Sequence, residues 1–401
     1  MGVGVDRGVG DRGGGAPTPT WYHMLDSWRG LACLMIVIHH AGYALLKSDV
    51  GDSWLRWSAW YGVRRMSLGV PLFFVISGYC IAASAESSVR RNESPWVFLK
   101  KRAWRIYPPY WLALAGFMLI LGLLDVAGYS RLFQHGRGVE LDAPWSLDGF
   151  QWLGNLTLTE TWRPHLLGSD RNVYTGVAWS LCFEEQFYFL CFLALCVFPG
   201  RMTHFLLGTT AAVAAVRIYA WWVDGLEGLS GSFLLLWHEF AVGLAVYYRL
   251  TRAGRPRVNR LIEAGLLALL VTGLAADGRE TAAAAAFGLL LIALKRWDTR
   301  VHEARWLMPF RESGRRCYAI YLAHLPAGVV GNQLLYEMGV TAFWGRALVM
   351  IPAVSVAGVV CGWYFHDAVE AFQKWFPGVT QGFRLGKELS QRRPRMFPQP
   401  R

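Results

Sequence analysis

The chain has 401 residues, of which 54% are hydrophobic and only 17% are charged. A chain this apolar indicates a polytopic membrane protein and argues against an ordinary soluble domain. Its formal net charge of +12 would suit a nucleic-acid partner in a soluble protein, but the basic residues gather in loops between apolar stretches. We therefore interpret these basic residues as a signal for membrane topology and expect no nucleic-acid partner. The seven cysteines show no metal-binding spacing, which predicts free thiols and no metal site.

Residues 1–24 are rich in glycine and lack apolar periodicity, so we expect a disordered N-terminal tail. Residues 25–372 then hold recurring apolar stretches, and residues 373–401 form a basic tail. We predict an all-α membrane domain of about ten transmembrane helices around a polar cavity. The stretches lie at residues 28–46, 67–84, 107–124, 178–198, 203–222, 231–248, 261–276, 282–294, 317–336 and 342–368.

The loops between these stretches carry unequal charge. Residues 86–105, 249–260 and 295–316 and the C-terminal tail are basic, and ten spans would place them on one side together with the N-terminus. The positive-inside rule assigns that side to the cytoplasm, so we expect a plasma or inner membrane protein with both termini cytoplasmic. The long segment 125–177 is expected outside, as an ordered lid with a helix capped by Ser146.

The first apolar stretch carries polar groups that a simple membrane anchor does not need; its sequence is LDSWRGLACLMIVIHHAGYALL. Arg29 and His40 are eleven residues apart, so on a helix they share one face about 16 Å apart, and Asp26 falls near that face. His39 lies about 100° round the helix from His40. An ionisable group inside a span is costly and usually faces a polar interior, which makes His40 a candidate reactive residue. The alternative is a core histidine bonded to a neighbouring helix.

A second candidate lies in the fourth stretch, which contains WSLCFEEQFY. Glu184 and Glu185 are adjacent carboxylates, and burying both is costly unless they are paired or one stays protonated. Helical rise places them about 9 Å from the outer membrane edge, level with His40, so we expect His40 to meet one of them. The alternative is a structural pair between a glutamate and an arginine.

Arg102 and Arg105 lie one helical turn apart at the entry to the third stretch. Guanidinium groups suit phosphate, so both are candidates for binding a soluble anionic ligand; anchoring to lipid phosphates is the alternative. The second stretch contains GVPLFFVISG, and we interpret its small residues and Ser77 as helix packing. Further polar groups within the spans favour a polar cavity. They are Tyr318, Tyr321, His324, Glu239 and Asp367.

Together these motifs resemble the acyltransferase-3 family of integral membrane acyltransferases. In that family an arginine precedes the key histidine by eleven positions, as Arg29 precedes His40 here. Four further motifs follow in the family's order, within about residues 25–370. They are GVPLFFVISGY, RAWRIYPPYW, WSLCFEEQFY and YAIYLAHLP. Two positions depart from the pattern: His39 replaces an apolar or aromatic residue, and Cys182 replaces a residue that is often small or polar.

The resemblance implies that acyl groups, commonly acetyl, pass from acyl-CoA to a hydroxyl on a carbohydrate, a lipid-linked glycan or a secondary metabolite. No cofactor is expected to be bound permanently. His40 would be the general base for the hydroxyl, or a nucleophile that carries the acyl group. Glu184 or Glu185 would orient its imidazole. Arg102 and Arg105 would bind the donor's phosphates, and Arg29 would contact the pantetheine arm or help set the potential of the cavity. The supporting positions are Asp26, His39, Ser77, Tyr318, Tyr321 and His324.

Two other classes of function fit the same sequence. A transporter or lipid flippase would use His40 and the glutamates as a proton relay, and repeated halves with broken helices would favour it, although no such repeat is present. A non-catalytic receptor would not need acyl-CoA at all. Hydrolysis or transfer of acyl-CoA by the purified protein separates these classes.

Overall fold

The computed structural model describes residues 22–128, 144–198, 201–223, 229–251, 255–276 and 278–375. Throughout these residues the regular secondary structure is helical, as predicted. Most of the two predicted tails, residues 1–21 and 376–401, lies outside the described residues.

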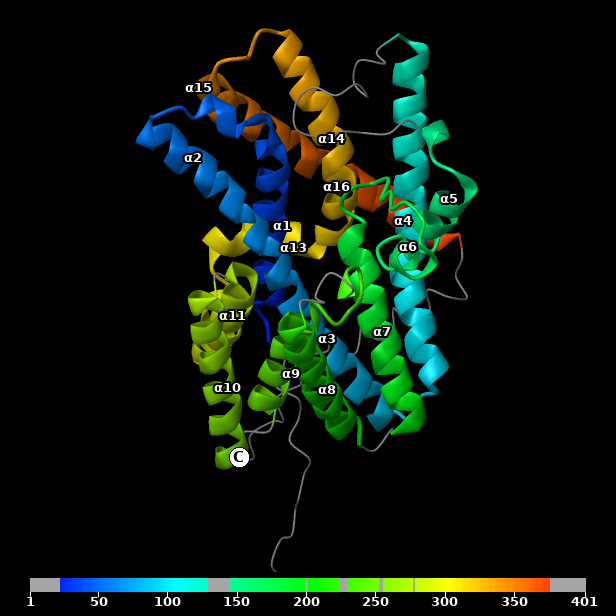
Figure 1. The fold of residues 1–401 in the computed structure, drawn as a ribbon, viewed down its shortest axis with the longest axis vertical. Coiled ribbons are helices and arrows are strands. Elements are labelled where there is room, and N and C mark those ends of the chain that lie inside the picture. Colours follow the sequence, from blue (N-terminus) through cyan, green and yellow to red (C-terminus); the bar gives the residue numbers. More distant parts are fainter. Residues whose placement is uncertain are drawn as a thin grey trace, which may run out of the picture.

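Each of the ten predicted apolar stretches is largely helical in the structure, and shorter helices connect them (Figure 1). The long helices are α1 (Leu25–Ala41), α3 (Gly69–Arg90), α4 (Pro95–Val126), α7 (Trp179–Val197), α8 (Met202–Trp222), α9 (Trp237–Thr251), α10 (Pro256–Ala275), α11 (Arg279–Leu294), α14 (Cys317–Glu337) and α16 (Ile351–Lys374). The short helices are α2 (Trp54–Arg65), α5 (Gly149–Leu156), α6 (Arg163–Leu167), α12 (Asp298–His302), α13 (Met308–Arg315) and α15 (Phe343–Gly345).

Five helical segments among the described residues are long and apolar enough to cross a membrane. They are Trp54–Arg90, Pro95–Val126, Trp179–Val197, Pro256–Ala275 and Phe343–Lys374. Some of the other helices are short: α1 has 17 residues, α9 has 15 and α11 has 16, whereas a span takes about 20. The structure therefore supports a multi-pass helical membrane protein, but the number of segments that meet this criterion is below the predicted ten.

Helix α1 packs in contact with α3, α13, α14 and α16 (Figure 1). Glycines allow the close contact between α1 and α13. A side chain at Gly30 would clash with the carbonyl oxygen of Phe310 in α13, and one at Gly314 would clash with the carbonyl oxygen of Asp26. Because two backbones that approach this closely leave no room for a Cβ atom, α13 fixes the N-terminal half of α1.

Helix α3 is the second central element, and it crosses α9 at another pair of glycines. A side chain at Gly78 would clash with the carbonyl oxygen of Phe240, and one at Gly243 would clash with that of Val75. The interpretation of the small residues in GVPLFFVISG as packing residues is therefore confirmed. Helix α3 also contacts α7, which in turn contacts α4, so α7 lies between α3 and α4 (Figure 1).

The predicted lid is ordered where the structure describes it, from residue 144 onward, but its helix begins differently from the prediction. Helix α5 is capped by Asp148 and not by Ser146: Gln151 N donates to Asp148 Oδ1 at 2.7 Å, and Asp148 N donates to Gln151 Oε1 at 3.1 Å. This reciprocal pair satisfies two backbone donors at once, which one serine hydroxyl does not do. Tyr110 of α4 donates to Asn155 O at 2.9 Å, so the lid is tied to α4.

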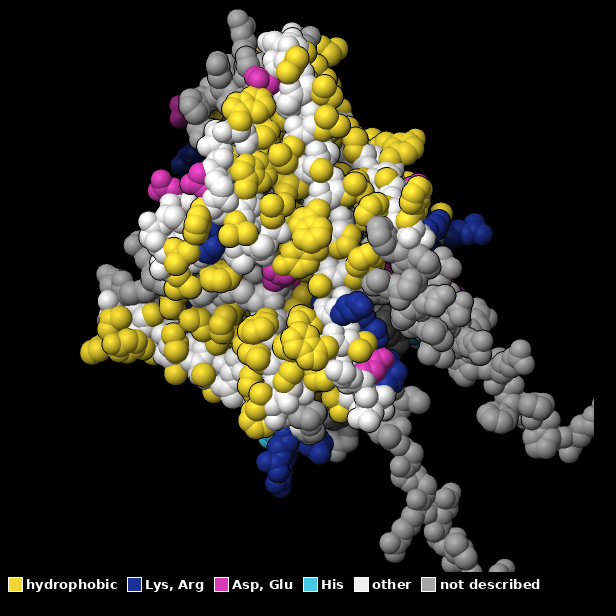
Figure 2. All heavy atoms as spheres, turned by 90° about the vertical axis from the view of Figure 1, so that its right-hand side faces the viewer, with side chains coloured by type: hydrophobic (Ala, Val, Ile, Leu, Met, Phe, Trp, Pro, Cys, Tyr) yellow, Lys and Arg dark blue, Asp and Glu magenta, His cyan; other side chains and the backbone are white. Residues whose placement is uncertain are grey.

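The outer face of α4 is apolar. Figure 2 shows hydrophobic side chains over most of the side of the molecule on which α4 lies. Trp96, Leu119 and Leu123 are each more than half exposed. An exposed apolar surface of this kind is expected of a helix that faces lipid.

Candidate functional site

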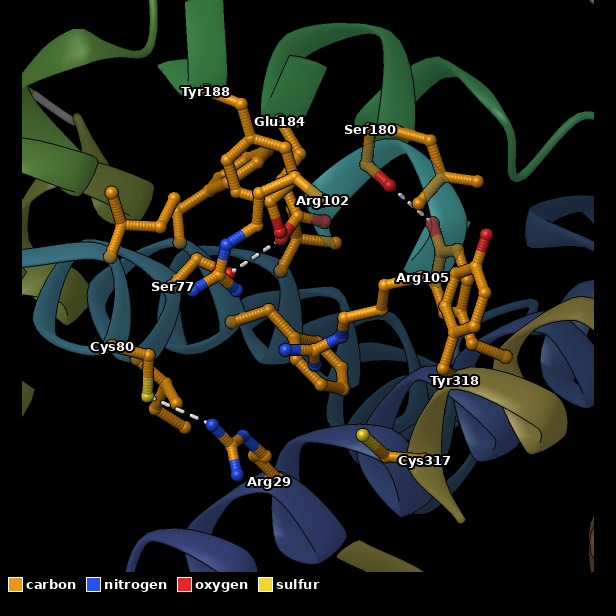
Figure 3. Close-up of a pocket in the computed structure, with 17 residues that line it drawn as sticks. Arg29, Ser77, Cys80, Arg102, Arg105, Ser180, Glu184, Tyr188, Cys317 and Tyr318 are labelled. Carbon is orange, nitrogen blue, oxygen red and sulfur yellow. Dashed lines mark hydrogen bonds between the residues drawn. The ribbon is translucent and has the colours of Figure 1, made fainter. Parts of the chain in front are cut away.

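Five helices, α1, α3, α4, α7 and α14, line a partly open cavity with about 750 Å³ of empty space, including open solvent. We call it the arginine cavity, because three arginines point into it, one from α1 and two from α4 (Figure 3). Its polar lining residues are Arg29, Ser77, Cys80, Arg102, Arg105, Ser180, Glu184, Tyr188, Cys317, Tyr318 and Tyr321. Its apolar walls come mostly from α3.

Arg29 is the one of the three arginines whose charge is already paired. Its Nη1 donates to Asp26 Oδ1 at 2.8 Å, and its Nη2 contacts Cys80 Sγ at 2.8 Å across the cavity wall (Figure 3). Asp26 precedes Arg29 by three residues, so the pair lies on one face of α1, as the helical period predicted.

Arg102 and Arg105 line the same cavity from α4, which confirms that they share one helix face. The guanidinium carbon of Arg102 lies 5.5 Å from the ring centroids of both Phe98 and Tyr188, and its Nε is buried without a hydrogen-bond partner. In the described part of the chain neither arginine forms an ion pair. Arg105 remains accessible because it points into the cavity (Figure 3). Two guanidinium groups thus face the cavity uncompensated.

Glu184 is the acidic residue among the described residues that line the cavity. Ser77 Oγ donates to its Oε1 at 3.1 Å, and the hydroxyl of Tyr188 donates to the same oxygen (Figure 3). One carboxylate against three guanidinium groups leaves the cavity electropositive, even after Arg29 is paired with Asp26. Such a cavity suits an anionic ligand, and forked guanidinium groups suit phosphate in particular.

Glu185 faces away from the arginine cavity. It lines a second, open cavity with about 1010 Å³ of empty space, including open solvent. We call it the α4–α7 cavity, and it is mostly apolar. Adjacent residues of a helix point about 100° apart, so the two glutamates necessarily face different surroundings. Arg102 and Tyr188 line both cavities. The other lining residues of the α4–α7 cavity are Leu99, Ala103, Ile106, Thr159, Trp162, Cys182, Gln186, Phe189, Leu190, Leu193 and Phe233.

His40 contacts another histidine, where a carboxylate was expected. Its Nδ1 lies 2.9 Å from Nε2 of His324 in α14, and Nδ1 of His324 lies 3.1 Å from the carbonyl oxygen of Ile320. The expected meeting of His40 with Glu184 or Glu185 is therefore wrong. The depth estimate compared heights only, whereas the helices that pack beside α1 are α3, α13, α14 and α16, and α7 is not among its main neighbours.

The remaining predicted residues lie around this pair of histidines. His39 points elsewhere: its Nδ1 is 3.4 Å from the carbonyl oxygen of Val63 in α2. The Tyr321 hydroxyl bonds Ser180 Oγ at 2.6 Å in the cavity wall, and its ring lies 5.8 Å from that of His324. Tyr321 therefore stands between the arginine cavity and the two histidines. Tyr318 lines the cavity as well and donates to Ile106 O at 2.9 Å.

Two of the polar residues expected around the cavity lie elsewhere. Glu239 is 2% exposed in α9, where it neighbours His238, and does not line either cavity. Asp367 is exposed on α16. The polarity of a residue within a span does not reveal which side of its helix the residue occupies.

Several cavity residues escaped the sequence analysis. Ser180 and Tyr188 were not predicted. They lie four residues before and four residues after the predicted Glu184, and all three line the arginine cavity, so they form one polar stripe on α7. The helical period could have revealed this stripe. Cys80 and Cys317 gave no such signal, because an isolated cysteine in an apolar stretch is usually a packing residue. Among the described residues there is no cluster of three side chains suited to a metal ion.

The comparisons with known proteins agree with this architecture. Residues 22–366 match the family described as Acyltransferase domain, Acyl_transf_3. A relative described as "Putative membrane-bound transacylase BcsY", from Komagataeibacter xylinus, is 26% identical over 352 residues, which cover 84% of this chain and 80% of that protein. No solved structure matches the chain. The chain therefore belongs to the acyltransferase-3 family and is a membrane-bound O-acyltransferase.

Proposed function

We propose that the protein moves an acyl group, commonly acetyl, from acyl-CoA to a hydroxyl on a carbohydrate, a lipid-linked glycan or a secondary metabolite. Family membership and the similarity to a membrane-bound transacylase support acyl transfer in a membrane. The identities of the donor and the acceptor are what we propose, and the arginine cavity is the observation that supports the proposal.

The charge of the arginine cavity favours a phosphorylated donor. Arg102 and Arg105 have no counter-ion in the described part of the chain, and burying the Nε of Arg102 without a hydrogen-bond partner is costly. An anionic ligand would remove this cost. Each phosphate of coenzyme A offers two oxygens that can accept two parallel hydrogen bonds from one guanidinium group. Arg102 and Arg105 are assigned to these phosphates. Glu184, held by Ser77 and Tyr188, would limit the positive charge of the cavity.

The same geometry supports a route for the thioester. Arg29 lines the arginine cavity, and His40 lies on the same face of α1 about 16 Å further along the axis. A donor whose phosphates are bound near Arg102 would extend its pantetheine arm past Arg29 toward His40. His40 would then take the proton of the acceptor hydroxyl, or would carry the acyl group briefly as a nucleophile. Glu185 lies in the α4–α7 cavity, away from this route.

The proposed setting is the plasma or inner membrane, with ten spans and both termini in the cytoplasm. The basic loops support this orientation, because ten spans place them all on one side. Helices shorter than about 20 residues, such as α1 and α11, would cross with the help of the helical turns that flank them or where the bilayer is thin.

Binding of the donor by the purified protein tests the proposal. Acetyl-CoA should bind at least tenfold more tightly than S-acetylpantetheine, which keeps the thioester and lacks the phosphates of the nucleotide. Raising the salt concentration should weaken binding of acetyl-CoA only. Equal affinity for both compounds would remove the arginine cavity from donor binding.

A further inference from the structure

The pair formed by His40 and His324 joins α1 and α14 behind Tyr321, which lines the arginine cavity. His324 is 2% exposed, and its two ring nitrogens both have partners: Ile320 O at Nδ1 and His40 at Nε2. We propose that His324 is a positioning residue that holds the ring proton of His40 on Nδ1 and so makes Nε2 of His40 the reactive atom. This inference rests on the proposed function, in which His40 handles the acceptor's proton.

The hydrogen-bond partners determine the placement of the protons. A backbone carbonyl only accepts, so Nδ1 of His324 must carry a hydrogen to bond Ile320 O. A neutral imidazole has one ring hydrogen, which leaves Nε2 of His324 as an acceptor. Its partner, Nδ1 of His40, must then be the donor. The remaining nitrogen of His40, Nε2, therefore has a free lone pair.

The packing around His324 holds its ring in this orientation. Gly358 of α16 lies against it, and a Cβ atom there would come within 3.1 Å of His324 Cβ and 3.6 Å of Val37 in α1. The helices α1, α14 and α16 therefore meet at this point, and a glycine lets α16 approach. The ring of Tyr321 lies 5.8 Å from the ring of His324 on the side of the cavity. A buried ring packed on these sides cannot turn freely.

The proposed step balances as follows. The lone pair on Nε2 of His40 takes the proton of the acceptor hydroxyl, and the oxygen forms a bond to the carbonyl carbon of the acyl thioester. The carbon–sulfur bond breaks, and its electron pair leaves with the sulfur. The sulfur then takes the proton back from Nε2, which yields an ester and a free thiol. While His40 is positively charged, its Nδ1–H donates to His324 Nε2, and a bond to a charged group is stronger than a neutral one.

His324 thus occupies the place that the sequence assigned to a glutamate. A carboxylate beside His40 would stabilise its cation more strongly but would also be costly to bury between apolar helices. A neutral imidazole sets the tautomer without that cost, and its second nitrogen is fixed by a backbone carbonyl that cannot move away from the helix.

Two amide variants of His324 separate its two bonds. His324→Gln places an amide near the Nε2 position, where its oxygen can accept from His40, whereas His324→Asn reaches only the Nδ1 position beside Ile320 O. The Asn variant should lower kcat by about ten- to hundredfold with little change in the KM for acetyl-CoA, because His324 does not line the arginine cavity. The Gln variant should recover most of that loss.

The control pair is His366→Gln and His366→Asn. His366 lies on α16, with its Nε2 3.4 Å from Glu370 Oε1, and lines neither cavity, so both variants should keep the wild-type kcat. Equal activity of His324→Gln and His324→Asn, in protein that is present at normal abundance in the membrane, would overturn the assignment. If His40→Ala were also active, the proposed function itself would fail; if only His40→Ala were inactive, the failure would concern His324 alone.

A spectroscopic measurement tests the tautomer without any turnover. The nitrogen chemical shifts of histidine labelled with nitrogen-15 distinguish protonated from unprotonated ring nitrogens. The His40 signals, assigned by their loss in His40→Gln, should show a hydrogen on Nδ1 in the wild type and a mixture of tautomers in His324→Asn. A hydrogen on Nε2 of His40 in the wild type would contradict the inference.

Discussion

The guanidinium carbon of Arg102 lies 5.5 Å from the ring centroid of Tyr188, and both side chains line the arginine cavity and the α4–α7 cavity. The pair thus separates an electropositive cavity from a mostly apolar one. Tyr188 also donates its hydroxyl hydrogen to Glu184, so the charge of Arg102, the aromatic ring and the carboxylate are held in one arrangement. Substitution of Arg102 should therefore alter binding of the donor.

Replacing Arg102 or Arg105 with Gln should raise the KM for acetyl-CoA about ten- to hundredfold, because each change removes a charge-assisted bond to phosphate. The variants should also make donor binding less sensitive to salt. The matched control is Lys100→Gln, an exposed residue of the same helix that lines neither cavity. Unchanged donor binding in a folded double variant would mean that the two arginines only anchor the helix.

Substituting a glycine at the contact between α3 and α9 should lower the stability of the protein. Gly243→Ala forces a Cβ atom against Val75 O and should lower the free energy of unfolding by about 1–3 kcal/mol. Gly265→Ala in α10 is the control, because a Cβ atom there meets nothing within 4 Å and alanine favours helix. Thermal unfolding in detergent compares the two. The packing argument fails if both alanine variants unfold at the same temperature.

Accessibility of single cysteines tests the proposed topology. In a background without the native cysteines, Ser169→Cys in the exposed part of the lid should react with an impermeant reagent in intact cells. Ser94→Cys, which is exposed in the turn between α3 and α4, should react only after lysis. The reverse pattern would invert the orientation.

The turn before α4 should lose stability in acid. Hydrogen bonds from Arg91 and Lys101 lower the pKa of Glu93 from 4.5 to about 2. A carboxyl group with a lowered folded-state pKa stabilises the protein above its unfolded pKa, and this contribution disappears as the pH falls from 4.5 toward 2. Glu93→Gln should therefore be less stable than the wild type at neutral pH, and the difference should narrow below pH 4.5.

Thermal unfolding measured across this pH range checks the prediction, with Glu337→Gln as the control. Glu337 is exposed at the end of α14 and accepts a hydrogen bond from Gln333. A difference between Glu93→Gln and the wild type that stays constant down to the lowest pH would show that the ion pairs of Glu93 contribute nothing.

The helical period predicted those features of the site that lie within one helix. It placed Arg102 and Arg105 on one face, paired Asp26 with Arg29, and separated His40 from His39. These relationships depend only on positions along a single helix. The helices themselves were predicted for the same reason, since an apolar stretch determines its own backbone in lipid.

The contacts between helices could not be predicted in this way. Helical rise predicted the same depth in the membrane for His40 and Glu184. In the structure, however, α1 packs beside α14, and His40 contacts His324. Close approach of α16 at Gly358 and of α13 at Gly30 decides which helices are neighbours of α1, and nothing in the spacing of polar residues reveals that. The pairing of His40 is a tertiary property.

The central claim is that Nε2 of His40 handles the proton of the acceptor while the donor is held in the arginine cavity. The most direct measurement supplies isotopically labelled acetyl-CoA to membranes that contain the native acceptor and follows the label into glycans and metabolites. His40→Ala, present at normal abundance, should transfer no label. His39→Ala should be much milder, because the His39 ring faces Val63 O and its aromatic neighbours. Full transfer by His40→Ala together with loss of transfer by His39→Ala would contradict the account.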